Sequence, residues 1–153
     1  MEILAGDQVK GVVFQPFEHT DNSYRLDGYK DYMSKEIASQ ETSIPMFMSA
    51  RHPCYIRELF KGKDQVIITG CGSALYASHM ASSALEARYK IPVRVLSAGE
   101  LQYDKHIAVG EKTLLIAVSQ SGETADTLRC VKKLGLTSLA VHNTKGSSLD
   151  RYC

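Results

Sequence analysis

The sequence predicts an α/β fold in which a parallel sheet carries helices on both faces. From Asp64 onward, short aliphatic and β-branched runs alternate with longer segments of helical periodicity. This alternation is typical of βαβ units, whose right-handed crossovers produce a parallel sheet. The composition is ordinary for a globular protein, with 44% apolar and 23% charged residues, and 153 residues suffice for one domain with a core.

The first 28 residues differ from the rest of the chain. A short apolar run over Val12–Phe14 precedes Pro16 and a polar stretch, which predicts one or two short strands and a linker. We therefore expect residues 1–28 to be a linker or the remnant of a preceding domain, and residues 29–153 to form the domain itself.

Helical spacing begins ahead of the alternating region. Apolar side chains over Tyr29–Ile37 recur at helical intervals, with Asp27 as the expected N-cap. Pro45 is expected to start a second helix and Pro53 to break it. A further short helix is expected over Ile56–Phe60.

The alternating region supplies the sheet and its helices. Four strands are expected, over Val66–Thr69, Val93–Leu96, Leu114–Val118 and Ser138–Val141. Helices are expected over Ala74–Arg88, Glu100–Tyr103 and Gly122–Leu134. A final turn of helix should begin with Ser147 as N-cap and Asp150 as its capping partner, and so short an ending suggests that the natural fold continues further.

Charge and cysteine content limit the classes of partner. A net charge of +1 gives no electrostatic indication of nucleic acid or membrane binding. Asp7 and Lys10 interrupt the N-terminus too early for a signal peptide. The four cysteines show no C-x-x-C spacing, which favours reduced thiols in a cytoplasmic protein over a zinc site. We expect no metal and no cofactor.

The strongest candidate site follows the Leu114–Val118 strand. The Ser119–Thr124 segment places Ser119, Gln120, Ser121 and Thr124 directly before a helix, at the edge where open parallel sheets bind ligands. Hydroxyl and amide donors beside the unpaired N–H groups of a helix N-terminus form an anion site, which predicts a phosphate on a small molecule. The alternative is that Ser121 simply caps the helix.

A second candidate follows the first strand of the sheet, in the turn over Gly70–Ala74. Two glycines and Ser73 precede a helix, but the third glycine of a dinucleotide-binding motif is missing. A tight strand-to-helix turn without a ligand explains this pattern equally well. If the two strands are neighbours, both candidates share one edge of the sheet.

Charged and titratable side chains near these turns add little chemistry. Glu123 would repel phosphate, so we expect it to face away, toward a partner subunit. His142 follows the fourth strand and is a weak acid–base candidate. The other histidines, His19, His52, His79 and His106, are expected in loops or on helix surfaces, and no catalytic residue is predicted.

With these residues assembled, the chain resembles the sugar isomerase (SIS) domain of glutamine–fructose-6-phosphate aminotransferases. The segment Ser119–Leu128 is similar to that family's signature, and three further stretches agree in order. These are Tyr32–Ile37, Gly70–Ser73 and Asn143–Leu149. The resemblance covers residues 29–152.

The resemblance implies a flavodoxin-like sheet of five parallel strands, a homodimer, and a bound hexose phosphate, either fructose 6-phosphate or glucosamine 6-phosphate. The fifth strand is missing from this chain. Carried over onto this sequence, the phosphate-binding residues are Ser119, Gln120, Ser121 and Thr124. Ser73 stands where the family has a sugar-contacting threonine, and Ala74 stands where it has a phosphate-binding serine. A lost neutral hydrogen bond costs about 0.5–1.5 kcal/mol, which weakens binding without abolishing it.

Three functions remain open at this point. The chain can be the first isomerase subdomain of an enzyme of glucosamine 6-phosphate synthesis, a stand-alone SIS module that senses phosphosugars, or a structural fragment with an empty pocket. The resemblance places the family's catalytic groups in a glutaminase domain and a second isomerase domain that this chain lacks, and Glu2 rather than a cysteine follows Met1. We therefore expect binding without turnover.

Overall fold

The computed structural model describes residues 4–5, 8–9, 25–49 and 55–153. The chain divides into two compact units, residues 1–51 and 52–153, and each is described by itself. In the first unit, β1 (Leu4–Ala5) pairs antiparallel with β2 (Gln8–Val9), so two short strands do occur in the N-terminal segment. The Val12–Phe14 run lies outside the described residues.

Helix α1 (Tyr32–Ser49) corrects two expectations. Its first turn is capped by Asp31, whose Oδ1 accepts the Ser34 N–H at 2.7 Å, whereas Asp27 has a φ of 50° and forms an ion pair with Lys35 at 2.6 Å. Pro45 lies inside α1 and does not start a second helix, because the φ that proline imposes is compatible with a helix that gives up one backbone hydrogen bond. Pro53 lies outside the described residues.

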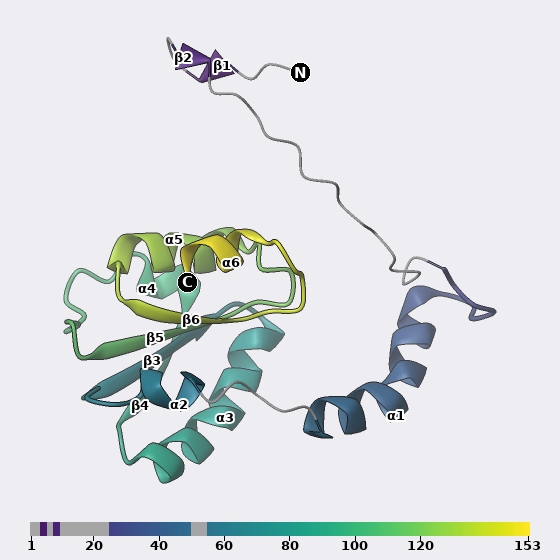
Figure 1. Cartoon of the computed structure of the whole chain (residues 1–153), viewed down its shortest axis with the longest axis horizontal. Helices are drawn as coiled ribbons and strands as arrows, with labels where there is room; N and C mark the ends of the chain where they lie inside the picture. The colour runs from purple at the N-terminus through teal and green to yellow at the C-terminus, as the bar shows by residue number, and fades with distance from the viewer. Residues whose placement is uncertain (1–3, 6–7, 10–24, 50–54) are drawn as a thin grey trace. The chain divides into compact units, whose positions relative to one another are not determined.

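The second unit contains the predicted parallel sheet, shown in Figure 1. Its strands run in the order β4-β3-β5-β6, and every neighbouring pair is parallel. The strands are β3 (Gln65–Gly70), β4 (Val93–Ser97), β5 (Thr113–Val118) and β6 (Thr137–Val141). The helices of this unit are α2 (Tyr55–Leu59), α3 (Ser73–Tyr89), α4 (Ala98–Leu101), α5 (Ala125–Leu134) and α6 (Ser148–Tyr152). The α/β class and all four predicted strands are confirmed.

Alternate strand residues supply the two halves of the core. On one face, Ile67 and Leu115 pack with side chains of α4, α5 and α6, including Cys130 and Leu149. On the other face, the alternate residues of β3 and β5 pack with Phe60 and with side chains of α3. Helices therefore cover both faces of the sheet, as the sequence predicts, and Figure 1 shows α4, α5 and α6 together on one side.

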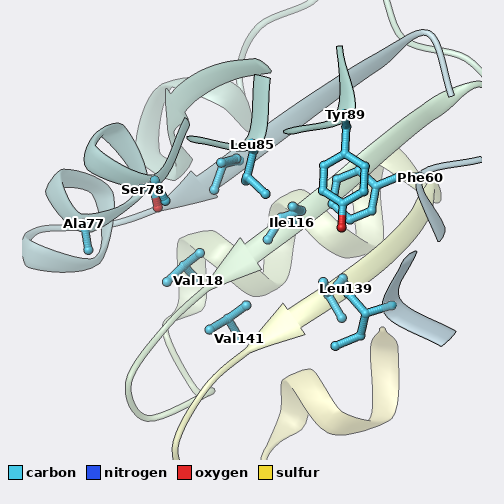
Figure 2. A pocket seen from close by; sticks show the side chains of 12 residues that line it. Phe60, Ala77, Ser78, Leu85, Tyr89, Ile116, Val118, Leu139 and Val141 are labelled. Atoms are coloured by element: carbon cyan, nitrogen blue, oxygen red, sulfur yellow. The ribbon is translucent and has the colours of Figure 1, made fainter. Parts of the chain in front are cut away.

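The α3 face is covered incompletely. A largely apolar groove with a volume of about 330 Å³ lies between α3 and the ends of β5 and β6, as Figure 2 shows. Its walls include Leu85, Ile116, Leu139 and Val141, and Val141 is half exposed.

Among the described residues, no helix has the length and apolar character that a membrane span needs.

The centre of the sheet fixes the position of the site. The chain leaves β3 toward β4 on one side, and it returns to add β5 on the other, so the topology switches between β3 and β5. Gly70 ends β3 opposite Val118 of β5, and a Cβ on Gly70 would lie 2.8 Å from the Val118 carbonyl oxygen. A glycine is therefore required for the two strand ends to approach this closely.

Candidate functional site

The two predicted turns lie side by side at the carboxyl edge of the sheet. Gly70 pairs with Val118, so the Gly70–Ala74 turn and the Ser119–Thr124 loop leave neighbouring strands at the same level. This confirms the expectation that the two candidates share one edge. Crevices at such a switch point are where open α/β sheets bind ligands.

The Ser119–Thr124 loop is held by hydrogen bonds within itself. Ser119 is only 2% exposed, and its Oγ lies 2.8 Å from Thr124 Oγ1 and accepts the Gly122 N–H at 3.1 Å. Ser121 Oγ accepts the Glu123 N–H, also at 3.1 Å. Ser119 thus joins the start of the loop to its end, while Gln120 is exposed and Ser121 is half-buried.

Helix α5 begins later than the sequence predicts. It starts at Ala125 with Thr124 as N-cap, and not at Gly122, because Gly122 has a φ of 68° that no helical residue adopts. Ser121 does not cap the helix, and Thr124 makes no side-chain cap hydrogen bond. The first N–H groups of α5 therefore have no side-chain cap and retain the partial positive charge of a helix N-terminus.

Helix α3 presents a comparable end from the neighbouring turn. It begins at Ser73, which is exposed, and its N-cap Gly72 provides no side-chain hydrogen bond. Ala74 is half-buried, and its Cβ lies 3.4 Å from the point where a Cβ on Gly70 would stand. The structure therefore places one hydroxyl, that of Ser73, at the start of α3, and Ala74 packs toward the strand end.

Glu123 faces its own chain, which corrects the expectation of a partner subunit. Its Oε1 accepts the Ser148 N–H at 2.6 Å, at the start of α6. The hydrogen bonds from Ser148 hold the pKa of Glu123 below its usual value, and the charge of Arg151 adds to this effect. The carboxylate is thereby occupied with α6.

The segment after β6 contributes contacts that sequence reasoning missed. Asp150 Oδ2 accepts the Gly146 N–H at 2.5 Å, and Asp150 Oδ1 lies 2.9 Å from His142 Nε2. Ser147 is the N-cap of α6 as predicted, but its Oγ lies 3.3 Å from His142 Nδ1 and makes no cap hydrogen bond. The expected Ser147–Asp150 capping box is therefore wrong, because both side chains are engaged around His142.

Other reactive side chains do not join this site. His106 lies exposed on a loop and His79 lies exposed on α3, whereas His19 and His52 are outside the described residues. Within the described part of the chain, no group of three or more histidine, cysteine, aspartate or glutamate residues could hold a metal ion.

Cys130 is buried, and burial raises the pKa of its thiol to about 11. It donates to the Ala98 carbonyl at 3.3 Å.

Comparison with known proteins identifies the family. The family model described as the SIS domain matches residues 58–153, which include the sheet and both turns of the candidate site. The chain belongs to the SIS domain family. This confirms the resemblance carried by the Ser119–Leu128 signature.

The relatives in this family are longer proteins. The chain is 37% identical over 137 residues to the glutamine–fructose-6-phosphate aminotransferase [isomerizing] of Corynebacterium diphtheriae, a match that covers 81% of this chain and 22% of that protein. It is 35% identical over 155 residues to the protein of the same name from Mycobacterium bovis, covering 92% of this chain and 24% of the relative. The chain thus spans about a quarter or less of the curated relatives it matches.

Solved structures agree with this assignment. The C-terminal domain of glucosamine-fructose-6-phosphate aminotransferase from Francisella tularensis superposes with a TM-score of 0.73 and 33% identity, covering 84% of this chain and 39% of that one. Glucosamine-6-phosphate deaminase from Thermotoga maritima superposes with a TM-score of 0.63 and 25% identity, covering 77% of this chain and 37% of that one. The SIS domain is therefore related to the isomerase region of the aminotransferases.

Proposed function

We propose that this chain binds a hexose phosphate, fructose 6-phosphate or glucosamine 6-phosphate, at the carboxyl ends of β3 and β5. The observation that carries the proposal is the start of α5, where the helix has no side-chain cap and follows a loop of hydroxyl and amide side chains. Backbone N–H groups at a helix start bind phosphate through direct hydrogen bonds and the helix dipole. The names of the aminotransferase and deaminase relatives point to the same class of ligand.

In this proposal, the residues of the Ser119–Thr124 loop have different roles in binding. Gln120, Ser121 and Thr124 offer side-chain donors to the phosphate, together with the first N–H groups of α5. Ser119 contributes through the loop as well, because its buried hydroxyl holds Thr124 Oγ1 in place at 2.8 Å. Ser73, exposed at the start of α3, contacts the sugar from the neighbouring turn.

In this proposal the chain is the first isomerase subdomain of a glutamine–fructose-6-phosphate aminotransferase and acts in amino-sugar synthesis. The identities to the aminotransferases support this assignment. The alternative is a SIS module that senses phosphosugars without chemistry. One observation favours it: both ring nitrogens of His142, the acid–base candidate at this edge, already face oxygen atoms of Asp150, Thr144 and Ser147.

The proposal includes a homodimer. Strand β6 forms one edge of the sheet, and the apolar groove beside it exposes Val141. Exposed strand edges and apolar surface favour pairing with another chain. Sedimentation velocity at micromolar concentration should show a dimer, and a single monomer peak over that range would contradict this part of the proposal.

Calorimetric titration tests the binding proposal. Glucosamine 6-phosphate should bind the wild-type chain, whereas glucosamine without phosphate should bind far more weakly. Ser121→Ala and Thr124→Ala should each weaken binding by about 2- to 10-fold, which corresponds to one lost hydrogen bond. The matched control is Ser83→Ala, an exposed serine of α3. Equal affinity of the loop variants and the wild type would refute the assigned site.

A further inference from the structure

The segment His142–Asp150 packs directly against the Ser119–Thr124 loop. The Ser147 side chain lies so close to Gly122 that a Cβ on this glycine would stand 2.2 Å from Ser147 Oγ. The same point lies 3.6 Å from His142 Cγ. Gly122 is therefore held against Ser147 and His142 at the place where the backbone of the loop turns.

Hydrogen bonds join the two segments at three further points. The Asn143 N–H donates to the Gln120 carbonyl at 3.1 Å, and the Leu149 N–H donates to the Gly122 carbonyl at 3.1 Å. The Ser148 N–H donates to the Glu123 carboxylate at 2.6 Å. The backbone of the loop thus takes its position from the segment after β6 as well as from its own hydroxyls.

His142 and Asp150 hold that segment in shape. The His142 side chain is 13% exposed, and its Nε2 lies 2.9 Å from Asp150 Oδ1. Its Nδ1 lies 3.1 Å from the Thr144 carbonyl and 3.3 Å from Ser147 Oγ. Asp150 Oδ2 also accepts the Gly146 N–H at 2.5 Å. One carboxylate therefore ties His142 to the turn that carries Ser147.

We infer that His142 and Asp150 are positioning residues that brace the Ser119–Thr124 loop through Ser147 and Gly122. The inference rests on the proposed function for its ligand, because the braced loop is the proposed phosphate site. Among the described residues, the side-chain hydrogen bonds and the ion pair of His142 go to Asp150, Thr144 and Ser147, and not to the hydroxyls of the loop. Its effect on the ligand is therefore indirect.

The bracing has a specific structural consequence. The Gly122 amide donates to Ser119 Oγ and the Glu123 amide donates to Ser121 Oγ, each at 3.1 Å. Hydrogen exchange at these two amides therefore reports whether the loop keeps its internal hydrogen bonds. If the brace is removed, Ser147 is free to move away from Gly122, and the loop loses its packing partner. The donors of the proposed phosphate site then occupy a wider range of positions, and binding must order them again.

The experiment compares His142→Ala, Asp150→Asn and the double variant with the wild type in the full chain. The matched control is His106→Ala, which changes an exposed histidine of a distant loop. Two quantities are measured: the affinity for glucosamine 6-phosphate by calorimetry, and amide hydrogen exchange without ligand. Exchange at Ile67 and Ile68 of β3 reports global opening, because these residues lie in the core.

The inference predicts that either single change weakens binding by about 2- to 10-fold, a range typical of one hydrogen bond. The double variant should be no weaker than the worse single variant, because both changes break one brace. Exchange at Gly122 and Glu123 should rise by at least about 10-fold while β3 stays unchanged. His106→Ala should match the wild type in both measurements.

Two outcomes would overturn the inference. Unchanged exchange at Gly122 and Glu123 in both single variants would show that the pair does not brace the loop. A parallel rise at the loop and at Ile67 would show a general loss of stability in place of positioning. If the wild-type chain binds no glucosamine 6-phosphate, the proposed function fails. The exchange measurement, which is made without ligand, still decides whether His142 and Asp150 hold the loop in position.

Discussion

Replacing Gly122 with alanine should destabilise the chain more than any ordinary glycine substitution at a positive φ. Gly122 has a φ of 68°, and an L-residue in this left-handed region costs about 1–2 kcal/mol. The added Cβ would also meet Ser147 Oγ at 2.2 Å and Ser147 Cβ at 2.5 Å. Ser147 as a whole is only 3% exposed, so its side chain has little room to move. Overpacking of this kind costs typically about 1–3 kcal/mol.

The two costs together predict a loss of about 2–5 kcal/mol in the free energy of unfolding. Urea unfolding followed by circular dichroism measures this loss, since the chain has no tryptophan to serve as a fluorescence probe. A loss of about 3 kcal/mol lowers the urea midpoint by roughly 1.5 M when the slope is about 2 kcal/mol per M.

Gly135→Ala separates the two contributions. Gly135 ends α5 with a φ of 56°, but a Cβ there would meet nothing within 4 Å. Only the conformational cost of about 1–2 kcal/mol should remain in this variant. Losses that agree within about 0.5 kcal/mol in the two variants would refute the contact between Gly122 and Ser147.

Three further predictions address charge and chemistry. Burial raises the pKa of Cys130 from 9.0 to about 11, so between these pH values the thiol ionises more readily in the unfolded chain than in the folded one. The free energy of unfolding of the wild type should therefore fall by on the order of 3 kcal/mol over this range. In Cys130→Ala, the urea midpoint should fall less over the same range, because this contribution is absent. The hydrogen bonds from Ser148 lower the pKa of Glu123, so its charged carboxylate stabilises the fold at neutral pH, and this stability is lost as the pH falls through the folded-state pKa. Glu123→Gln should therefore be less stable than the wild type at neutral pH, with a thermal-melting difference that disappears as acid protonates Glu123. The chain alone should form no glucosamine 6-phosphate from fructose 6-phosphate and ammonia, because both ring nitrogens of His142, the acid–base candidate at this edge, already face oxygen atoms of Asp150, Thr144 and Ser147. Product above background in a chromatographic assay would contradict this.

The strands were predictable because their signals are local. Aliphatic and β-branched residues fill β3 and β5, and each expected strand agrees with the observed one within one residue at either end. The shared edge followed from topology alone, since parallel neighbours end at the same level. These features depend on residue type and chain order, which a sequence displays directly.

The helix starts were less predictable because capping depends on backbone geometry. Asp27 and Asp31 both precede α1, and only Asp31 reaches an N–H of the first turn. Before α5, a glycine can adopt either a negative or a positive φ, and the sequence does not show which one Gly122 adopts. Its φ is positive, so the helix begins only at Ala125. Pro45 was expected to mark the start of a new helix, but α1 continues through it, so a proline does not by itself fix a helix boundary.

Side-chain contacts that depend on how the loop segments fold against one another were not predictable from the sequence. The pattern of Ser147 and Asp150 suggested a capping box, but the approach of His142 gave both side chains other partners. Likewise, Glu123 finds the Ser148 N–H only because α6 folds back beside the loop. The donor residues of the proposed site were chosen from the sequence, whereas the contacts that support them required the fold.

The most direct test of the proposed phosphate site is a titration of the isotope-labelled chain with glucosamine 6-phosphate, followed by amide chemical shifts. Binding at the start of α5 should shift the amides of residues 119–126 and, to a smaller extent, those at the start of α3 around Ser73. The same titration with glucosamine should leave these amides unchanged, because the phosphate supplies the anchor. Shifts confined to other parts of the chain, or none at millimolar ligand, would contradict the account.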